Sequence, residues 1–317
     1  MDTINKLMAA YQSKIVGQEE LRLALVVAMI AEGHVLLESL PGLAKTLAAK
    51  TLAEATNGSF SRIQCTPDLL PSDIIGTQIY NYGKGTFETK IGPVAANFVL
   101  LDEINRSSAK TQSAMLEAMQ ERQVSVGGVV YRMPSPFVVF ATENPIEQEG
   151  TYELPEAQLD RFLLKVIVPY PKFEEEIKIL DYTLAGQTTT PLPDSAKVSL
   201  EEIKALQARA KTIKVDDAIK KYIANLAYAS REPGKYIDAN LAKYVEYGMS
   251  PRGAIALLRV AQVLAMLHGR DYVTPDDVKE LRYPVLRHRI MLNFEADADG
   301  VHPEAIIDAI FARVVTP

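Results

Sequence analysis

A lysine and a threonine stand side by side in a short loop rich in small residues. Residues 38–46 read ESLPGLAKT, close to the phosphate-binding pattern G-x-x-x-x-G-K-[ST]. In a loop of this kind Lys45 would contact the β- and γ-phosphates of a nucleotide, and the Thr46 hydroxyl would ligate Mg²⁺. A structural turn that happens to contain Lys-Thr is the alternative explanation for this loop taken alone.

Two glycines of that pattern are replaced, by Ser39 and Ala44, whereas Gly42 is retained. Ala44 needs only helical dihedral angles if it already belongs to the start of the following helix. Ser39 is the less favourable replacement, because a positive φ at that position would cost a serine about 1–2 kcal/mol. We therefore expect Ser39 to be the irregular residue of the loop.

Two carboxylates follow an apolar run further along the chain. Residues 98–106 read FVLLDEINR, which predicts a buried strand that ends at an acidic pair. Asp102 at the end of such a strand can hold Mg²⁺, and Glu103 can polarise the water that attacks a γ-phosphate. Acidic residues also begin many solvated loops, but their position after a phosphate loop and an apolar strand favours the catalytic interpretation.

Three further polar residues are candidates for the same site. Asn144 follows the apolar run at 137–141. Ligands of open α/β sheets lie beyond the carboxyl ends of the strands, so Asn144 is predicted to orient the attacking water or to contact the γ-phosphate. Asn-Pro is also a common turn former. Arg161 precedes another apolar run and Arg252 begins a helix, and each alone also fits an ordinary surface arginine.

The elements that must position these residues alternate along the first part of the chain. Short apolar runs separated by helical segments predict a parallel sheet covered on both faces. These five runs are 34–38, 60–65, 98–102, 137–141 and 163–168. We predict an α/β domain over 1–185, a Pro-containing linker over 186–198 and an all-helical domain over 199–317, with no strand after residue 200.

Composition limits the remaining classes of function. The net charge of −6 argues against a broad nucleic-acid-binding surface. The single cysteine, Cys65, excludes an internal disulfide, suits a reducing compartment and is predicted to be a buried strand residue. The N-terminus lacks a signal pattern, and the most apolar stretch, 21–37, is short and interrupted by polar residues. We therefore expect a cytoplasmic protein without a membrane span.

These blocks together resemble the MoxR family of AAA+ ATPases, and the similarity runs from IVGQEE (15–20) to YPVLRHRI (283–290). PGLAKT resembles the family's Walker A loop, in which alanine at the Ala44 position is usual. LLDEINR resembles its Walker B box, ATENP its sensor 1, LPEAQLDRF its arginine-finger segment and GMSPRGAIAL its sensor 2. Residues 67–81 resemble its helix-2 insert, and residues 121–142 resemble its hairpin before sensor 1.

The resemblance implies a P-loop core whose sheet order is 5-1-4-3-2, a four-helix lid and assembly into rings, usually hexamers. ATP would lie between core and lid, with Mg²⁺ held by Thr46 and Asp102. Arg252 would reach the nucleotide from the lid of the same chain, and Arg161 would reach the γ-phosphate bound to the neighbouring subunit. The implied nucleotide-binding residues are Val16 and Gln18 near the adenine, then Pro41, Gly42, Leu43, Ala44, Lys45, Thr46 and Asp102.

The family's implied role is chaperone-like: its members hydrolyse ATP to remodel or activate protein complexes, often with partners that carry von Willebrand factor A domains. One alternative is a nucleotide-binding switch or scaffold that barely hydrolyses ATP because of Ser39. Another is a DNA-associated motor, although the hairpin VSVGGVVYRM offers only Tyr131 and Arg132 for nucleic acid. The basic segment 287–289 is expected either to contact an adjacent subunit or to be a solvated helix end.

Overall fold

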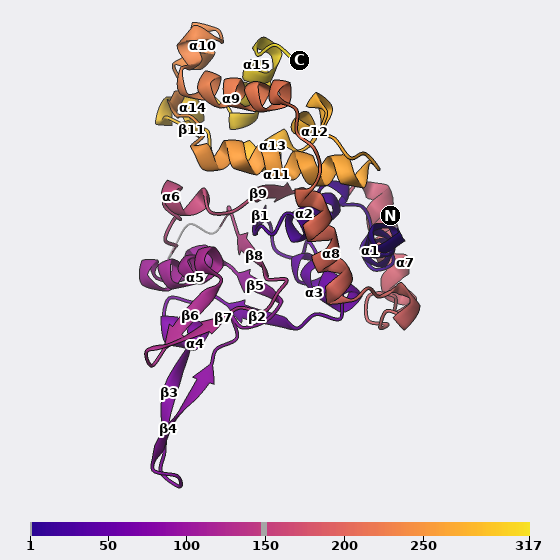
Figure 1. The fold of residues 1–317 in the computed structure, drawn as a ribbon, viewed down its shortest axis with the longest axis vertical. Coiled ribbons are helices and arrows are strands. Elements are labelled where there is room, and N and C mark those ends of the chain that lie inside the picture. The colour runs from indigo at the N-terminus through magenta and orange to yellow at the C-terminus, as the bar shows by residue number, and fades with distance from the viewer. Residues whose placement is uncertain (1, 147–150) are drawn as a thin grey trace.

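A parallel five-stranded sheet forms the centre of the molecule (Figure 1). The computed structural model describes residues 2–146 and 151–317. The sheet has the order β2-β5-β8-β1-β9, and all neighbouring strands are parallel. Counted along the chain and read from β9, this is the predicted order 5-1-4-3-2. Its strands are β1 (Val35–Ser39), β2 (Phe60–Gln64), β5 (Phe98–Asp102), β8 (Val138–Glu143) and β9 (Leu164–Val168).

Both faces of the sheet are covered, which explains the continuous apolar runs. Along β5, Phe98 and Leu100 belong to one buried cluster, whereas Val99 and Leu101 belong to the other. Successive strand residues point to opposite faces, so a strand buried on both sides needs apolar residues at every position. The helices that cover the first face are α2 (Glu19–Ile30) and α3 (Lys45–Ala55), and α5 (Ala109–Glu121) covers the second.

Two antiparallel hairpins extend the core. The first, β3 (Gly76–Asn81) and β4 (Thr86–Ile91), follows the short helix α4 (Pro71–Ile75) and projects as a long arm away from the sheet (Figure 1). The second pairs β6 (Gln123–Val126) with β7 (Val129–Arg132) before β8. The first begins in the segment that resembles the family's insert and continues ten residues beyond it to Ile91, and the second lies in the segment that resembles the family's hairpin. Cys65, which follows β2, is buried as predicted.

The segment predicted as a linker is attached to the core. After α7 (Phe173–Leu184) the chain passes through turns and a short 3-10 helix, Asp194–Ala196. The Leu192 N–H donates to Oε1 of Glu54 at 2.6 Å, and the Val198 N–H donates to the Ala55 carbonyl at 2.7 Å. The connection between the two parts therefore rests on the end of α3, the helix that begins at Lys45.

Helices dominate the C-terminal part. Its long helices are α8 (Leu200–Lys211), α9 (Asp217–Arg231), α11 (Pro251–Leu267) and α15 (Pro303–Arg313). The shorter ones are Pro233–Lys235, α10 (Ala239–Ala242), α12 (Pro275–Glu280), α13 (Arg282–Leu286) and α14 (Phe294–Ala298). The prediction of no strand after residue 200 was wrong, because β10 (Val245–Tyr247) pairs with β11 (Met291–Leu292). Strands of two or three residues are too short to show an alternating pattern.

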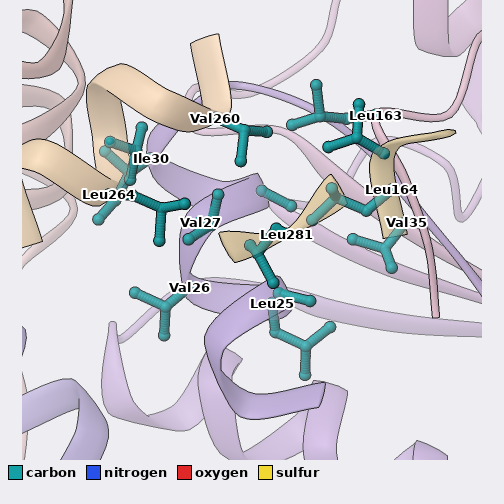
Figure 2. Packing of buried hydrophobic residues seen from close by; sticks show 14 of the residues in the cluster. Leu25, Val26, Val27, Ile30, Val35, Leu163, Leu164, Val260, Leu264 and Leu281 are labelled. Atoms are coloured by element: carbon teal, nitrogen blue, oxygen red, sulfur yellow. The ribbon is translucent and has the colours of Figure 1, made fainter. Parts of the chain in front are cut away.

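The helical part packs on the core through α2. Side chains of α2 meet Val260 and Leu264 of α11 and Leu281, close to Val35 at the start of β1 (Figure 2). Core and lid thus share one hydrophobic cluster, and burial of each such side chain contributes about 1.5–3 kcal/mol. The remaining helices are α1 (Asp2–Gln12), Ile104–Arg106 after β5, and α6 (Glu156–Leu159) before β9. None of the described helices is long and apolar enough to cross a membrane.

Candidate active site

The phosphate loop joins β1 to α3, and its strained residue is Ala44. Ser39 is the last residue of β1, is buried, and is not among the described residues with positive φ. Gly42 and Ala44 have φ of 84° and 55°. The expectations for Ser39 and Ala44 were therefore wrong: Ala44 is the N-cap of α3 in the left-handed region, outside the helix rather than in its first turn.

A cavity of about 450 Å³ opens at the carboxyl ends of the strands, beside this loop. It brings together Lys45 and Thr46 from the start of α3 with the residues that follow β5 and β8. The sequence-predicted residues that line it are Pro41, Gly42, Leu43, Ala44, Lys45, Thr46, Asp102, Glu103 and Asn144. Arg62 and Gln64 of β2 line it as well.

Lys45 is held among opposite charges. Its Nζ donates to the Ser39 carbonyl at 3.2 Å. Burial lowers the pKa of Lys45, while the negative charges of Asp102 and Glu103 act in the opposite direction. An ammonium group at this position can bind an additional anion, because its own donors are only partly used.

Thr142 and Gln64 hold the two carboxylates. The Thr142 hydroxyl donates to Oδ1 of Asp102 at 2.8 Å and accepts from the Glu103 N–H at 2.8 Å. Gln64 Nε2 donates to Oε2 of Glu103 at 3.1 Å, and Arg106 Nε lies 3.1 Å from the same oxygen. Glu103 itself has φ of 58°, so the chain turns sharply where β5 ends and directs this carboxylate to the cavity.

Oxygen donors and loop geometry fit a magnesium–nucleotide complex. Mg²⁺ prefers carboxylate and hydroxyl oxygens, which Asp102 and Thr46 supply on the same cavity. A Cβ at Gly42 would meet no atom within 4 Å, so the loop backbone there faces open space. Asn144 is 5% exposed, and its Oδ1 accepts from the Ile146 N–H at 3.3 Å.

A smaller, mostly apolar pocket of about 100 Å³ adjoins the phosphate cavity and shares Gly42, Leu43, Ala44 and Leu47 with it. Val16 and Gln18, for which a position near an adenine stays a prediction, both line this pocket, and Gln18 Nε2 donates to the Leu43 carbonyl at 3.2 Å. Other residues of its lining are Lys14, Ile15, Pro171, Ile179, Tyr182 and Thr188. The two pockets therefore adjoin each other along the phosphate loop.

Arg161 and Arg252 lie elsewhere, in a cavity of about 500 Å³ at the amino ends of the strands. Gly33 and His34 before β1 and Leu163 before β9 line the same cavity. In Figure 1, α6, which precedes β9, and α7, which follows it, lie beyond opposite ends of the strands. Five arginines line this cavity, which we call the arginine cavity: Arg122, Arg161, Arg252, Arg259 and Arg289.

The expectation that Arg252 reaches the nucleotide of its own chain was therefore wrong. The apolar face of α11 packs on α2 and α8, which directs the start of α11 to the amino edge of the sheet. Ser250, the N-cap of α11, donates through its hydroxyl to Oδ2 of Asp160 at 2.7 Å. Arg252 consequently lines the same cavity as Arg161 rather than the phosphate cavity.

The expectation that segment 287–289 is a solvated helix end was also wrong, because His288 and Arg289 are buried at 2% and 5% exposure. Its expected contact with an adjacent subunit stays a prediction. Its Nε donates to Oδ1 of Asp160 at 2.8 Å, and its other nitrogens donate to main-chain carbonyls including that of Leu163. His288 Nε2 lies 3.1 Å from the Phe162 carbonyl, and burial holds its pKa well below the usual value. The lid thereby fixes the backbone on both sides of Arg161.

Comparison with known proteins agrees with the division into an α/β core and a helical C-terminal part. Residues 34–164 match the model of the ATPase family associated with various cellular activities (AAA), and residues 237–310 match the AAA lid domain. Chaperone MoxR1 of Mycobacterium tuberculosis is 46% identical over 99% of this chain and 82% of its own length. This chain belongs to the MoxR family of AAA+ ATPases. Protein MoxR of Paracoccus denitrificans is 33% identical over 98% of this chain and 95% of its own length.

A solved structure of the same kind confirms the fold. The crystal structure of a protein from Cytophaga hutchinsonii, assigned there as an ATPase, superposes with a TM-score of 0.92 at 44% identity. The match covers 100% of this chain and 95% of that one. The MoxR fold therefore extends through both the core and the lid described above.

Sequence reasoning missed several residues of this MoxR site. Arg62 and Gln64 lie on β2, and the register that sets Gln64 opposite Asp102 depends on which strands are neighbours. Thr142 belongs to the quoted ATENP block, but only its contact with Asp102 indicates a role. Ile179 and Tyr182, which line the smaller pocket, come from α7, whose pattern gave no sign of a face that lines a pocket. Asking which polar residues end each predicted strand would have found Gln64.

Proposed function

We propose that this protein is a Mg²⁺-dependent ATPase that hydrolyses ATP to ADP and phosphate between adjacent copies of the chain. The observation that carries the proposal is the division of its polar residues. Lys45, Asp102 and Glu103 line the cavity at the carboxyl edge of the sheet, whereas Arg161 and Arg252 line the cavity at the amino edge. One chain therefore carries the two halves of a phosphate site on two different surfaces, one at each end of the strands.

The carboxyl-edge half would bind and activate the nucleotide. Thr46 and Asp102 would hold Mg²⁺, which supplies charge neutralisation to the phosphate oxygens. Lys45 would contact the β- and γ-phosphates, and Glu103 would accept a hydrogen bond from the attacking water and orient it. Asn144, whose carbonyl oxygen is already used by its own loop, would contact the γ-phosphate or that water through its amide nitrogen.

The amino-edge half would complete the site of a neighbouring copy. Head-to-tail contacts between identical chains generate rings when the rotation closes, and the two cavities lie on opposite edges of one sheet. In such a ring, which we propose to be a hexamer, Arg161 and Arg252 would both face the γ-phosphate held by the next subunit. The Nε of Arg161 is buried and has no hydrogen-bond partner among the described residues, which fits a side chain that completes its contacts on a ligand.

The work done with ATP would be the remodelling or activation of a protein complex. The relative from Mycobacterium tuberculosis is named a chaperone, which supports this role. The β3–β4 arm exposes Tyr80, Tyr82 and Phe87 well away from the nucleotide site, and we propose that it faces the client. From the family resemblance we also propose a partner that carries a von Willebrand factor A domain. The single cysteine, which is buried and suits a reducing compartment, supports a cytoplasmic location.

A switch with little hydrolysis has less support than it had from the sequence. The reason to expect a slow site was strain at Ser39, and Ser39 has an extended backbone. A DNA-associated motor is not favoured by any contact in the described part of the chain. Stimulation of turnover by DNA with a steep dependence on salt would support it instead.

ATP turnover of Glu103→Gln and Arg161→Ala tests the proposal. Glu103→Gln should lower turnover by about 100-fold or more while ATP still binds, because an amide does not orient water as a carboxylate does. Arg161→Ala should lower turnover by about a thousandfold. Glu117→Gln and Arg132→Ala, both exposed and outside the cavities, are matched controls. Unchanged turnover in Glu103→Gln or Arg161→Ala would contradict the assigned roles.

A further inference from the structure

The ligand proposed for Mg²⁺, Asp102, already has a cationic partner. Arg62 donates to Oδ2 of Asp102 through Nε at 3.1 Å and also through Nη2. The Thr142 hydroxyl donates to the other oxygen, Oδ1, at 2.8 Å. Both carboxylate oxygens of Asp102 therefore accept hydrogen bonds from the chain itself, and Oδ2 accepts two from the guanidinium.

The two donors to Asp102 differ in how firmly they are held. Thr142 is fully buried, and its hydroxyl also accepts from the Glu103 N–H. Arg62 is 50% exposed at its side chain, against 12% for Asp102. Arg62 also donates to Oε1 of Gln64 at 3.0 Å, and this second contact is exposed to solvent. Arg62 is thus the donor that can leave, and Thr142 is the donor that keeps the carboxylate in place.

The phosphate cavity is lined by equal numbers of basic and acidic side chains. The charged residues that line it are Lys45 and Arg62 on one side, and Asp102 and Glu103 on the other, so their formal charges cancel. Mg²⁺ or its bound water at Oδ2 of Asp102 would compete with the guanidinium for the same lone pairs. A released guanidinium would remain in the phosphate cavity, and its planar fork suits phosphate oxygens.

We propose that Arg62 is a displaceable counter-ion of Asp102, which yields the carboxylate to Mg²⁺ and then contacts the phosphate chain of the nucleotide. The proposal rests on the proposed function, because it needs Mg²⁺ and ATP in this cavity. In the absence of Mg²⁺ Arg62 balances the charge of Asp102, and its release makes Mg²⁺ and the nucleotide assist each other's binding. Mg²⁺ frees Arg62 from Asp102 to contact the nucleotide, and the phosphates of the nucleotide draw Arg62 away from Asp102, which frees the carboxylate for Mg²⁺. Such coupling is reciprocal.

Binding of a fluorescent, non-hydrolysable ATP analogue to the full chain, over a titration of Mg²⁺ and in EDTA, tests the proposal. In Arg62→Ala, the Mg²⁺ concentration that gives half of the maximal change in analogue binding should fall about tenfold, because Asp102 no longer has to be released from Arg62. Binding of the analogue in EDTA should weaken about tenfold, because Asp102 then has no counter-ion and its negative charge repels the phosphates. Arg132→Ala, an exposed arginine of β7, is the control and should change neither quantity.

Asp102→Asn provides a second measurement that does not depend on the Mg²⁺ midpoint. The neutral amide should release Arg62, so the analogue should bind more tightly in EDTA than it binds to the wild type. Adding Arg62→Ala to this variant should remove the gain. Equal Mg²⁺ midpoints in wild type and Arg62→Ala, or no gain in Asp102→Asn, would overturn the proposal. Failure of the wild type to bind the analogue with Mg²⁺ would instead overturn the proposed function.

Discussion

Two glycines of the phosphate-loop pattern are replaced, but only one of the two positions, Ala44, has a strained backbone. An alanine in the left-handed region costs about 1–2 kcal/mol, and Ala44 has φ of 55° as the N-cap of α3. Ser39 is extended and buried at the end of β1. The phosphate loop therefore stores strain at the residue directly before Lys45.

Glycine substitutions at the two positions should have opposite effects on stability. Ala44→Gly should raise the free energy of unfolding by about 1 kcal/mol, because glycine adopts positive φ without the steric cost of Cβ. Ser39→Gly should lower it by about 0.5–1 kcal/mol, because glycine in a strand loses more conformational entropy on folding. Urea unfolding measures both values. If Ser39→Gly stabilised the protein and Ala44→Gly did not, the strain would lie at Ser39 after all.

Residues at the ends of strands were predictable, and their partners were not. Lys45, Asp102 and Asn144 follow apolar runs, so the sequence alone indicates that they share one edge of a parallel sheet. The contacts of Arg62 and Thr142 with Asp102 depend on β5 lying between β2 and β8. Strand order is not contained in the pattern of any single strand, so these contacts required the structure.

At the scale of elements, the apolar runs in the sequence predicted the core strands correctly, whereas the position of α11 was predicted wrongly. Continuous apolar runs identify strands covered on both faces, whereas the path of α11 is set by its packing on α2 and α8. That packing joins segments far apart in the chain, so no local pattern indicates that Arg252 lies in the same cavity as Arg161. The buried contacts of Arg289 hold the same region of the core from α13 and the turn that follows it.

Arg289→Met should destabilise the protein by about 3–5 kcal/mol, because it leaves the partly buried Asp160 carboxylate and several carbonyls without their donor. Arg289→Lys should recover part of this loss, since an ammonium can contact Asp160 but cannot reach the carbonyls as a fork. Urea unfolding is the measurement. Arg259→Met, an exposed arginine of the same cavity, should shift stability by only about 0.5 kcal/mol. Equal losses in the two methionine variants would contradict the role of Arg289 as the link between lid and core.

At the scale of the whole molecule, the position of Arg252 changes how subunits should complement one another. The phosphate cavity and the arginine cavity lie at opposite edges of one sheet, so a complete site needs residues from two chains. Variants of the two halves are then defective at different faces. A mixed assembly contains some interfaces in which both faces are intact.

Mixing inactive variants should therefore restore ATP turnover in a defined pattern. Lys45→Ala mixed equally with Arg161→Ala should leave about a quarter of the interfaces intact under random head-to-tail assembly, and should recover a similar share of wild-type turnover. Lys45→Ala with Arg252→Ala should recover as much, because both arginines belong to the same face. Arg161→Ala with Arg252→Ala should recover nothing, since one face is defective in every chain. If Arg252 acted on the nucleotide of its own chain, the last two results would be exchanged: the Lys45 pair would stay inactive and the two arginine variants would complement each other.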